Sequence, residues 1–184
     1  MNNSNKTIVT IVGIGLLASG CASSQYTYNY PVASLNERGL NLIEAGKCDE
    51  AVELLEQALE ITDLDGVYNN LGTAYNCQGE YDKAVAMFQE AINQNPIATY
   101  FHNLTITYLD RGYDGDIERA EQALDNVKRL DPNFKSLEYA YAKLEYTNGN
   151  YTKANGYIKG FLENYPDHKK GRSLEQAIEA ELNR

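Results

Sequence analysis

The sequence predicts an all-α solenoid made of about four similar helix pairs and one closing helix, on two observations. First, alanine recurs with spacings of 33, 36 and 34 residues, each time several residues after a glycine and four residues before a large apolar side chain. A fixed period of this length is typical of stacked helical hairpins. Second, the C-terminal segment is amphipathic, with Leu174, Ile178 and Leu182 at four-residue intervals, which predicts a capping helix. The recurring alanines are Ala51, Ala84, Ala120 and Ala154.

Composition limits the classes of partner. A chain of 184 residues is long enough to bury one continuous core and suits a single domain. Acidic residues outnumber basic ones by 26 to 16, which gives a formal charge of −10. A strongly acidic chain without a basic stripe repels phosphate backbones, so nucleic acid is not expected as a partner.

Residues 1–20 have the pattern of an export signal. Lys6 supplies one positive charge, and residues 8–17 (IVTIVGIGLL) form an apolar run that is too short to span a bilayer. Small residues follow at 18–20, and then comes Cys21. We therefore predict a signal peptide that is removed before Cys21, and an ordinary signal with a cysteine close by is the alternative.

The run LLASGC resembles the lipobox of bacterial lipoproteins, with Leu17 one place further from Cys21 than in the commonest form. This resemblance implies that the Cys21 thiol receives a covalent lipid and that several acyl chains anchor the protein durably. It also associates Ala22, next to Cys21, with transfer to the outer membrane, so the expected location is the periplasmic face of that membrane.

Residues 21–31 are polar, rich in tyrosine and without a helical period, which predicts a flexible tether between the lipid and the domain. Because Tyr26, Tyr28 and Tyr30 alternate, addition of this segment as a strand to a partner's sheet is the alternative.

The unit VYNNLGTAYNCQGEYDKAVAMFQEAINQNP resembles the tetratricopeptide repeat at ten signature positions. The positions are Tyr68, Leu71, Gly72, Tyr75, Gly79, Tyr81, Ala84, Phe88, Ala91 and Pro96. The resemblance implies a right-handed solenoid with units at 32–64, 65–97, 98–133 and 134–166 and a capping helix at 167–184. Expected helices lie at about 33–46, 49–62, 66–78, 81–94, 98–111, 117–130, 134–148, 151–165 and 169–183.

The resemblance also implies that the first helix of each pair lines a concave groove that binds a protein segment. The groove positions in this sequence are Asn36, Leu40, Ile43, Asn69, Thr73, Asn76, His102, Ile106, Leu109, Tyr139, Lys143 and Tyr146. Lys143 is the one basic residue among them, so the pattern by which some relatives hold a carboxylate is absent. We expect amide and apolar contacts to an extended segment, with binding on the convex face or an edge as the alternative.

Repeat geometry brings two further cysteines to one edge of the stack. Cys48 falls in the turn of the first unit and Cys77 near the end of the next unit's first helix. This placement implies a possible disulfide, which an exported compartment permits. Two separate, half-buried thiols are the alternative.

Catalysis is not expected. The two histidines, His102 and His168, fall in different units, and neither has a serine or cysteine motif beside it. Metal-ligand spacing and a phosphate-binding loop are also missing from the sequence. We therefore predict a non-enzyme without cofactor, metal or small-molecule substrate, whose one added group is the lipid on Cys21.

As a small lipoprotein built of helical repeats, this chain resembles the pilotin-type factors of Tad (Flp) and type IV pili. That resemblance implies an assembly or escort factor with an envelope protein as partner, such as an outer-membrane secretin or a pilus component. The alternative is a scaffold for peptidoglycan enzymes or outer-membrane assembly components. The first unit departs from the repeat at Arg38 and Asp63, so we expect an incompletely covered N-terminal end, where another copy or a partner could pair.

Overall fold

The computed structural model describes residues 29–184 and contains, within them, nine α-helices and no strand. The all-α prediction is confirmed, and each of the nine expected helices is found. Their bounds are α1 (Asn29–Glu44), α2 (Cys48–Ile61), α3 (Asp65–Gln78), α4 (Tyr81–Gln94), α5 (Ala98–Arg111), α6 (Asp116–Leu130), α7 (Leu137–Thr147), α8 (Tyr151–Asn164) and α9 (Lys169–Leu182).

Small residues allow the two helices of a pair to approach closely. A Cβ on Gly72 would lie 2.8 Å from Cε1 of Phe88, and one on Gly39 would lie 2.7 Å from Cγ of Leu55. Both distances are shorter than van der Waals contact, so glycine is required at these two positions. Gly39 and Gly72 therefore have a packing role in the first two pairs, whereas the glycine five residues before each recurring alanine lies in a turn with a positive φ, as at Gly46 and Gly79.

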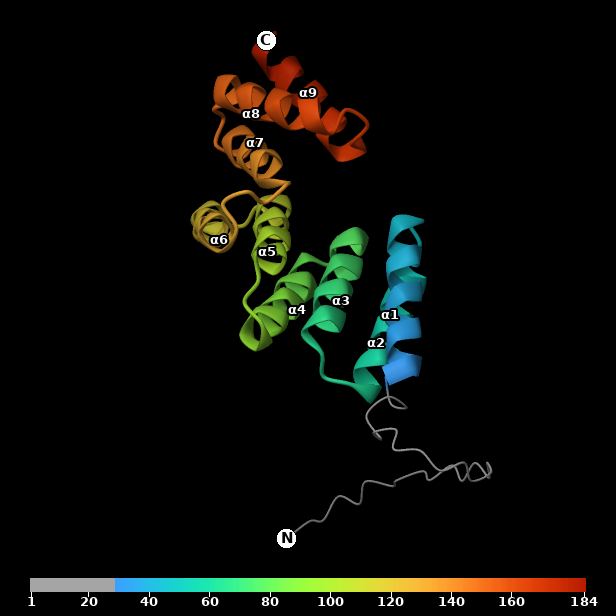
Figure 1. The fold of residues 1–184 in the computed structure, drawn as a ribbon. Helices are drawn as coiled ribbons and strands as arrows, with labels where there is room; N and C mark the ends of the chain where they lie inside the picture. Colours follow the sequence, from blue (N-terminus) through green and yellow to red (C-terminus); the bar gives the residue numbers. More distant parts are fainter. Residues whose placement is uncertain (1–28) are drawn as a thin grey trace, which may run out of the picture.

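The helices form a curved stack (Figure 1). Each helix packs on the next one along the chain, and the first helices of the pairs also contact one another in the order α1, α3, α5, α7 and α9. The second helices, α2, α4, α6 and α8, make no such contacts with one another. The first helices therefore line the inner side of the arc, and the second helices form its outer side.

The buried apolar side chains form two clusters. The larger cluster extends from α4 to α9, and the smaller one joins α1, α2 and α3. Tyr75 packs against both clusters and links them. The first helix pair thus shares its small core with α3 of the second pair.

Two predicted boundaries are wrong. Residues 29–31, which we assigned to the tether, belong to α1. Pro31 lies in the first turn, where a helix does not need its missing N–H, and Val32 beside it is buried. Helix α7 begins at Leu137 rather than at residue 134 because a turn precedes it, in which the Phe134 N–H donates to the Asp131 carbonyl at 3.1 Å.

The predicted signal peptide, the lipid acceptor Cys21 and the tether up to residue 28 lie outside the described residues. Within residues 29–184, none of the helices combines the length and the apolar character that a membrane span requires.

Candidate functional site

Two adjoining hollows lie on the inner side of the arc. The central hollow encloses about 200 Å³ between α3, α5, α7 and the start of α9, and the terminal hollow encloses about 370 Å³ between α5, α7 and α9. Both are lined by Ile106, Tyr139 and Lys170, so they form one continuous depression, which we call the groove. The central hollow is also lined by Thr73, Asn76, Phe88, His102, Asn103, Ser136 and His168, and the terminal hollow by Asp110, Lys143, Lys169, Ser173 and Leu174.

Six of the twelve residues that the sequence proposed for the groove line it in the structure. They come from three different helix pairs and are Thr73, Asn76, His102, Ile106, Tyr139 and Lys143. Asn36 and Asn69 lie on the same inner side and join a row of side-chain amides described below.

The other four proposed residues do not line the groove. Leu109 is buried in the larger core, and Ile43 packs against the smaller one. The Tyr146 ring contacts the Tyr151 ring, with centroids 5.7 Å apart, and Leu40 is exposed. Leu109 and Ile43 occupy the border between inner face and core, where burial removes apolar surface from water and so favours the core.

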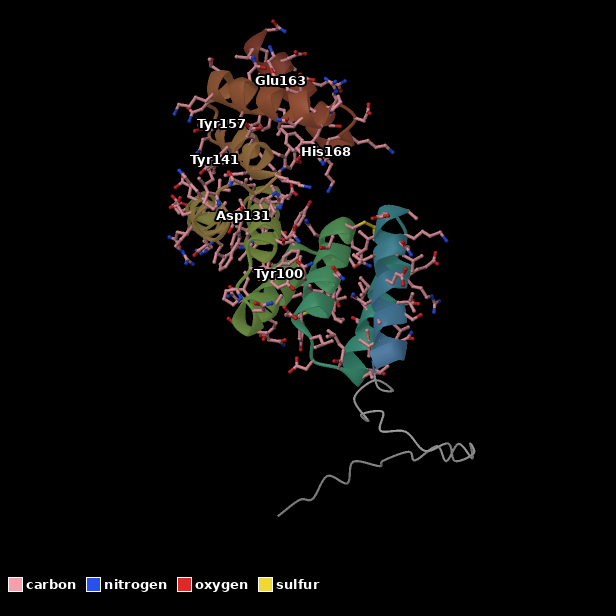
Figure 2. All side chains as sticks on the ribbon, viewed as in Figure 1. Tyr100, Asp131, Tyr141, Tyr157, Glu163 and His168 are labelled. Carbon is pink, nitrogen blue, oxygen red and sulfur yellow. A yellow bond between two sulfur atoms is a disulfide. The ribbon has the colours of Figure 1, made fainter. Side chains whose placement is uncertain are left out.

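Helix α9 contributes groove residues that the sequence did not reveal. Lys169 and Lys170 line the groove beside Lys143, so the expectation of a single basic residue there is wrong. Lys143 itself is paired with Asp110 at 2.7 Å. Figure 2 labels His168 at the beginning of α9, where its Nδ1 accepts a hydrogen bond from the Gly171 N–H at 3.0 Å. This cap fixes the end of α9 that carries the two lysines.

Side-chain amides form a row along the inner side from α1 to α5. Nδ2 of Asn70 donates to Oδ1 of Asn36 at 2.8 Å, and Nδ2 of Asn69 donates to Oδ1 of Asn70 at 3.1 Å. Nδ2 of Asn103 then donates to Oδ1 of Asn69 at 2.8 Å. Asn70 and Asn103 were not among the predicted groove residues. Each bond between helices joins two asparagines that lie 34 residues apart, which is one repeat, and this spacing could have revealed them.

His102 stands at the α5 end of this amide row. Its Nδ1 lies 3.4 Å from Oδ1 of Asn103, and its ring packs 5.1 Å from the Phe134 ring. Burial disfavours the charged imidazolium and lowers the pKa of His102 to about 4. The ring is therefore neutral at physiological pH, and its two nitrogens have different roles, one as a donor and the other as an acceptor.

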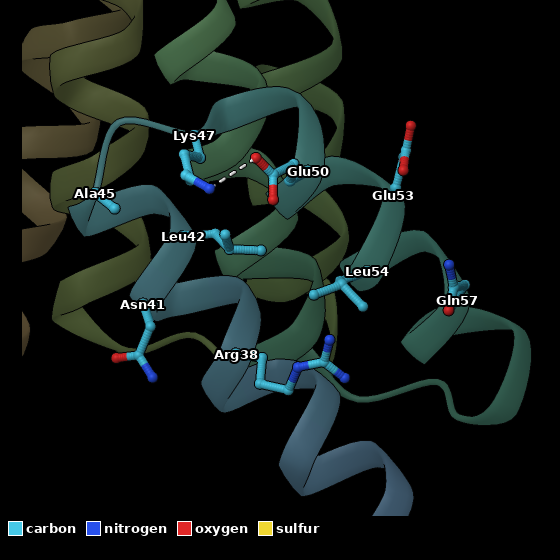
Figure 3. A pocket seen from close by; sticks show the side chains of 9 residues that line it. All are labelled: Arg38, Asn41, Leu42, Ala45, Lys47, Glu50, Glu53, Leu54 and Gln57. Carbon is cyan, nitrogen blue, oxygen red and sulfur yellow. Dashed lines mark ion pairs between the residues drawn. The ribbon is translucent and has the colours of Figure 1, made fainter.

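Another hollow, of about 540 Å³, lies on the first helix pair (Figure 3). Leu42 and Leu54 form its apolar part, and the Lys47–Glu50 ion pair, at 3.1 Å, stands beside them. This face is the N-terminal end of the described stack, where we expected incomplete cover. The groove is the better candidate site because it draws side chains from several helix pairs.

Cys48 at the start of α2 and Cys77 near the end of α3 are joined as a disulfide in the structure, with 5.8 Å between their Cα atoms. The bond links the first helix pair to the second at one edge of the stack. Next to the disulfide, Nε2 of Gln78 donates a hydrogen bond to Oδ1 of Asp49 at 2.8 Å.

The groove offers hydrogen bonds and apolar surface. Hydroxyl, amide and ammonium groups surround Ile106 and Tyr139, an arrangement that suits a polypeptide segment with alternating polar and apolar contacts. Among residues 29–184 there is no group of three side chains that could hold a metal ion.

Comparisons with known proteins agree with this architecture. Two family models described as tetratricopeptide repeat match residues 31–96 and 109–169, which together make up more than half of the chain. A curated relative, the TPR repeat-containing protein YpiA of Bacillus subtilis (strain 168), is 26% identical over 99 residues. That match covers 53% of this chain but only 23% of the relative.

Solved structures show the same fold. TTC0263, a thermophilic TPR protein of Thermus thermophilus, superposes with a TM-score of 0.74 at 20% identity and covers 83% of this chain and 84% of its own. A tetratricopeptide repeat protein of Parabacteroides merdae gives 0.66 at 18% identity, over 87% of this chain and 62% of its own. The repeat period, the paired helices with their close glycine contacts and both family matches lead to one assignment: this chain belongs to the tetratricopeptide repeat family.

Proposed function

We propose that this protein is a lipid-anchored interaction module that escorts or stabilises an outer-membrane component of a pilus or secretion machine. Tetratricopeptide repeats serve protein–protein interaction, and the groove is the surface through which we expect the partner to be held. The observation that carries the proposal is the continuous groove, to which α3, α5, α7 and α9 all contribute side chains.

The character of the groove supports a polypeptide partner. Among the described residues, Lys170 is the one charged residue that lines the central hollow, and the lining becomes more basic toward α9, where Lys143 and Lys169 join it. An extended segment of a partner can make main-chain hydrogen bonds to the hydroxyl and amide groups while its side chains cover Ile106 and Tyr139. The lysines attract acidic residues in that segment, although the chain as a whole is acidic.

The predicted lipid anchor at Cys21 supports the proposed role at the outer membrane. The lipobox-like run before Cys21 would fix the protein to the membrane, and the short segment after it would keep the groove near the membrane surface. Tethering raises the local concentration of the groove for membrane partners, so a modest affinity suffices. The pilotin-type role rests on resemblance in size and design to such lipoproteins.

Partner capture from envelope extracts tests this proposal. The tagged full chain should crosslink to a secretin or pilus component, and Cys21→Ser should lose the lipid, measured by mass, and reduce the amount of that component in the outer membrane. Thr73→Arg should abolish capture because it fills the central hollow, whereas Glu90→Arg on the outer helix α4 should not. Recovery of a peptidoglycan hydrolase without any secretin or pilus component would replace the escort role by a scaffold role.

A further inference from the structure

Two loops at one edge of the stack expose large aliphatic side chains. Leu64, in the loop between α2 and α3, is 47% exposed, and Ile97, in the loop between α4 and α5, is 38% exposed. Ile61, the last residue of α2, is exposed beside them. We call these three side chains the apolar edge. The four turns at the opposite edge, between the two helices of each described pair, contain one large apolar side chain, Tyr113.

Two members of the apolar edge stand where polar residues would stabilise the fold. Leu64 and Ile97 are the N-cap residues of α3 and α5, at the same place in successive repeats. Serine, threonine, aspartate or asparagine at this position accepts a hydrogen bond from a free N–H of the first helical turn, and an aliphatic side chain cannot. Neither capping nor burial in a core accounts for these residues, which indicates a contact with something outside the described fold.

Hydrogen bonds join the two loops into one surface. Nε2 of Gln94 donates to Oδ1 of Asp63 at 2.9 Å, and Nδ2 of Asn95 donates to Oδ2 of Asp65 at 2.8 Å. The Tyr100 hydroxyl also donates to Oδ2 of Asp65, at 3.0 Å. The apolar edge is therefore carried by two loops that are held in a fixed relation to each other.

The apolar edge lies on the side of the stack where the described chain begins. Helices α1 and α2 are antiparallel neighbours, so the start of α1 lies beside the end of α2, and both lie with the two loops at the lower side of Figure 1. Residues 22–28 separate the predicted lipid acceptor Cys21 from Asn29, and a segment of this length reaches about 30 Å at most. The opposite edge lies one helix length, about 20 Å, further away. A lipid on Cys21 would therefore keep the apolar edge near the membrane.

Charge indicates the kind of membrane surface. Glu60 and Asp63 are exposed next to Ile61 and Leu64 in the chain. A second copy of the chain that paired through this edge, or an anionic lipid, would bring negative charge against these carboxylates. A zwitterionic phospholipid offers an ammonium group to the carboxylates and an apolar layer to the aliphatic side chains.

We propose that the apolar edge inserts into the interface of a zwitterionic phospholipid membrane and so fixes the orientation of the anchored protein. A few aliphatic side chains bind a membrane weakly, but the anchor makes their insertion intramolecular. Helices α1 and α3 then stand with their starts at the membrane, and the groove is held in one orientation to partners in that membrane. This inference rests on the proposed function, because it needs the lipid on Cys21.

Single tryptophans test the contact, since the chain contains none. The lipidated protein with Leu64→Trp or Ile97→Trp would be reconstituted in vesicles of phosphatidylcholine and phosphatidylethanolamine, with and without brominated acyl chains. Bromine quenches only a nearby indole, so both variants should lose most of their emission in brominated vesicles. Tyr113→Trp, at an exposed position of the opposite edge, is the matched control and should keep its emission.

Two further measurements separate membrane contact from stability and from charge. Leu64→Asn supplies a cap for α3, so the melting temperature should rise by about 2 to 4 °C. Ile61→Trp should nevertheless be quenched several-fold less when Leu64→Asn and Ile97→Asn are added, because the apolar edge is lost. Vesicles made mainly of phosphatidylglycerol should quench Leu64→Trp less than the zwitterionic vesicles do, and stronger quenching there would overturn the choice of a zwitterionic surface.

The outcomes separate this inference from the proposed function. Equal emission from Leu64→Trp and Tyr113→Trp in brominated vesicles would overturn the membrane contact, and partner capture by the same protein would still support the interaction module. Quenching of Leu64→Trp alone, without a captured partner, would support the membrane contact and show that the escort function is wrong. Absence of the lipid on Cys21, measured by mass, would overturn both.

Discussion

The first and third helix pairs share one topology but differ in what holds them together. In the first pair, Val32 is the one buried apolar side chain among residues 32–44 of α1, and Ile61 at the end of α2 is 52% exposed. In the third pair, α5 buries seven side chains, and it has neighbouring pairs on both sides. Stability in a solenoid is approximately a sum of repeat and interface terms, so a pair with one neighbour has less support.

Polar contacts and covalent links stabilise the two pairs in different ways. The first pair is joined to the second by the Cys48–Cys77 bond and by the amide bond between Asn36 and Asn70. The third pair contains a buried carboxylate, Asp116, which accepts from Arg111 at 2.7 and 2.9 Å. The end of the stack therefore depends on links to one neighbouring pair, whereas the middle depends on a core that it shares with pairs on both sides.

Truncation of a core side chain should give the largest effect. Leu124→Ala in α6 should lower the free energy of unfolding by about 3 to 4 kcal/mol, because Leu124 is almost fully buried in the larger core. Urea unfolding followed by circular dichroism measures this, with Glu121→Ala on the exposed side of α6 as control.

The equivalent change in the smaller core, Leu55→Ala, should increase hydrogen exchange mainly in α1, α2 and α3. An equal increase in α7 and α8 would contradict the separation of the two cores.

Loss of the disulfide should have the second-largest effect, and this effect should fall on the first helix pair. Replacing Cys48 and Cys77 by serine should cost about 3 kcal/mol, since the bond closes a loop of 29 residues in sequence separation. Hydrogen exchange should rise in α1 and α2 and stay unchanged in α8. The bond itself is checked by mass spectrometry, and two alkylatable thiols in unreduced protein would show that the first pair is held without it.

Loss of the buried carboxylate should have a smaller, pH-dependent effect. Asp116→Asn should cost about 2 kcal/mol at neutral pH, because hydrogen bonds to charged groups are lost. The Arg111 guanidinium lowers the pKa of Asp116 to about 2. A lowered pKa means that this stabilisation is complete above the ordinary carboxyl pKa of about 4 and is lost as the pH falls toward 2.

The difference between wild type and Asp116→Asn should therefore shrink as the pH falls through that window, whereas Asp114→Asn in the exposed turn just before α6 should show no such change. A difference that is constant over this pH range would mean that the charge on Asp116 does not support the third pair.

The smallest effect is expected at the end of the amide row. Asn36→Ala should cost about 1 kcal/mol, because one neutral hydrogen bond to Asn70 is lost. Asn41→Ala on the exposed side of α1 is the control. Thermal unfolding of both variants measures the difference, and equal melting temperatures would show that the row adds nothing to the first pair.

Local features were readable from the sequence. The recurring glycine and alanine predicted the helix pairs, because the turn at each glycine and the buried contact at each alanine are made between neighbours in the chain. The four-residue spacing of apolar residues predicted α9. The start of α1 was missed because the polar residues before Pro31 have no helical period and because Pro31 itself reads as a break.

The far end of the groove was not readable. Lys170 and Thr73 line the same hollow although nearly one hundred residues separate them, and their meeting depends on curvature that accumulates over several helix pairs. A pattern within one repeat carries no information about that curvature. The amide row was found only in part, because the predicted groove residues are fixed positions on the first helices, whereas the row follows asparagine from one repeat to the next.

Photo-crosslinking in living cells tests the central claim, that the groove on the inner side of the arc holds a polypeptide partner. A photoreactive residue would replace Thr73 or Ser173 in the groove, and Glu90 or Lys159 on the outer helices. If the groove holds the partner, protein adducts of one discrete mass should form from both groove positions and none from the outer positions. Adducts from the outer positions alone would contradict it.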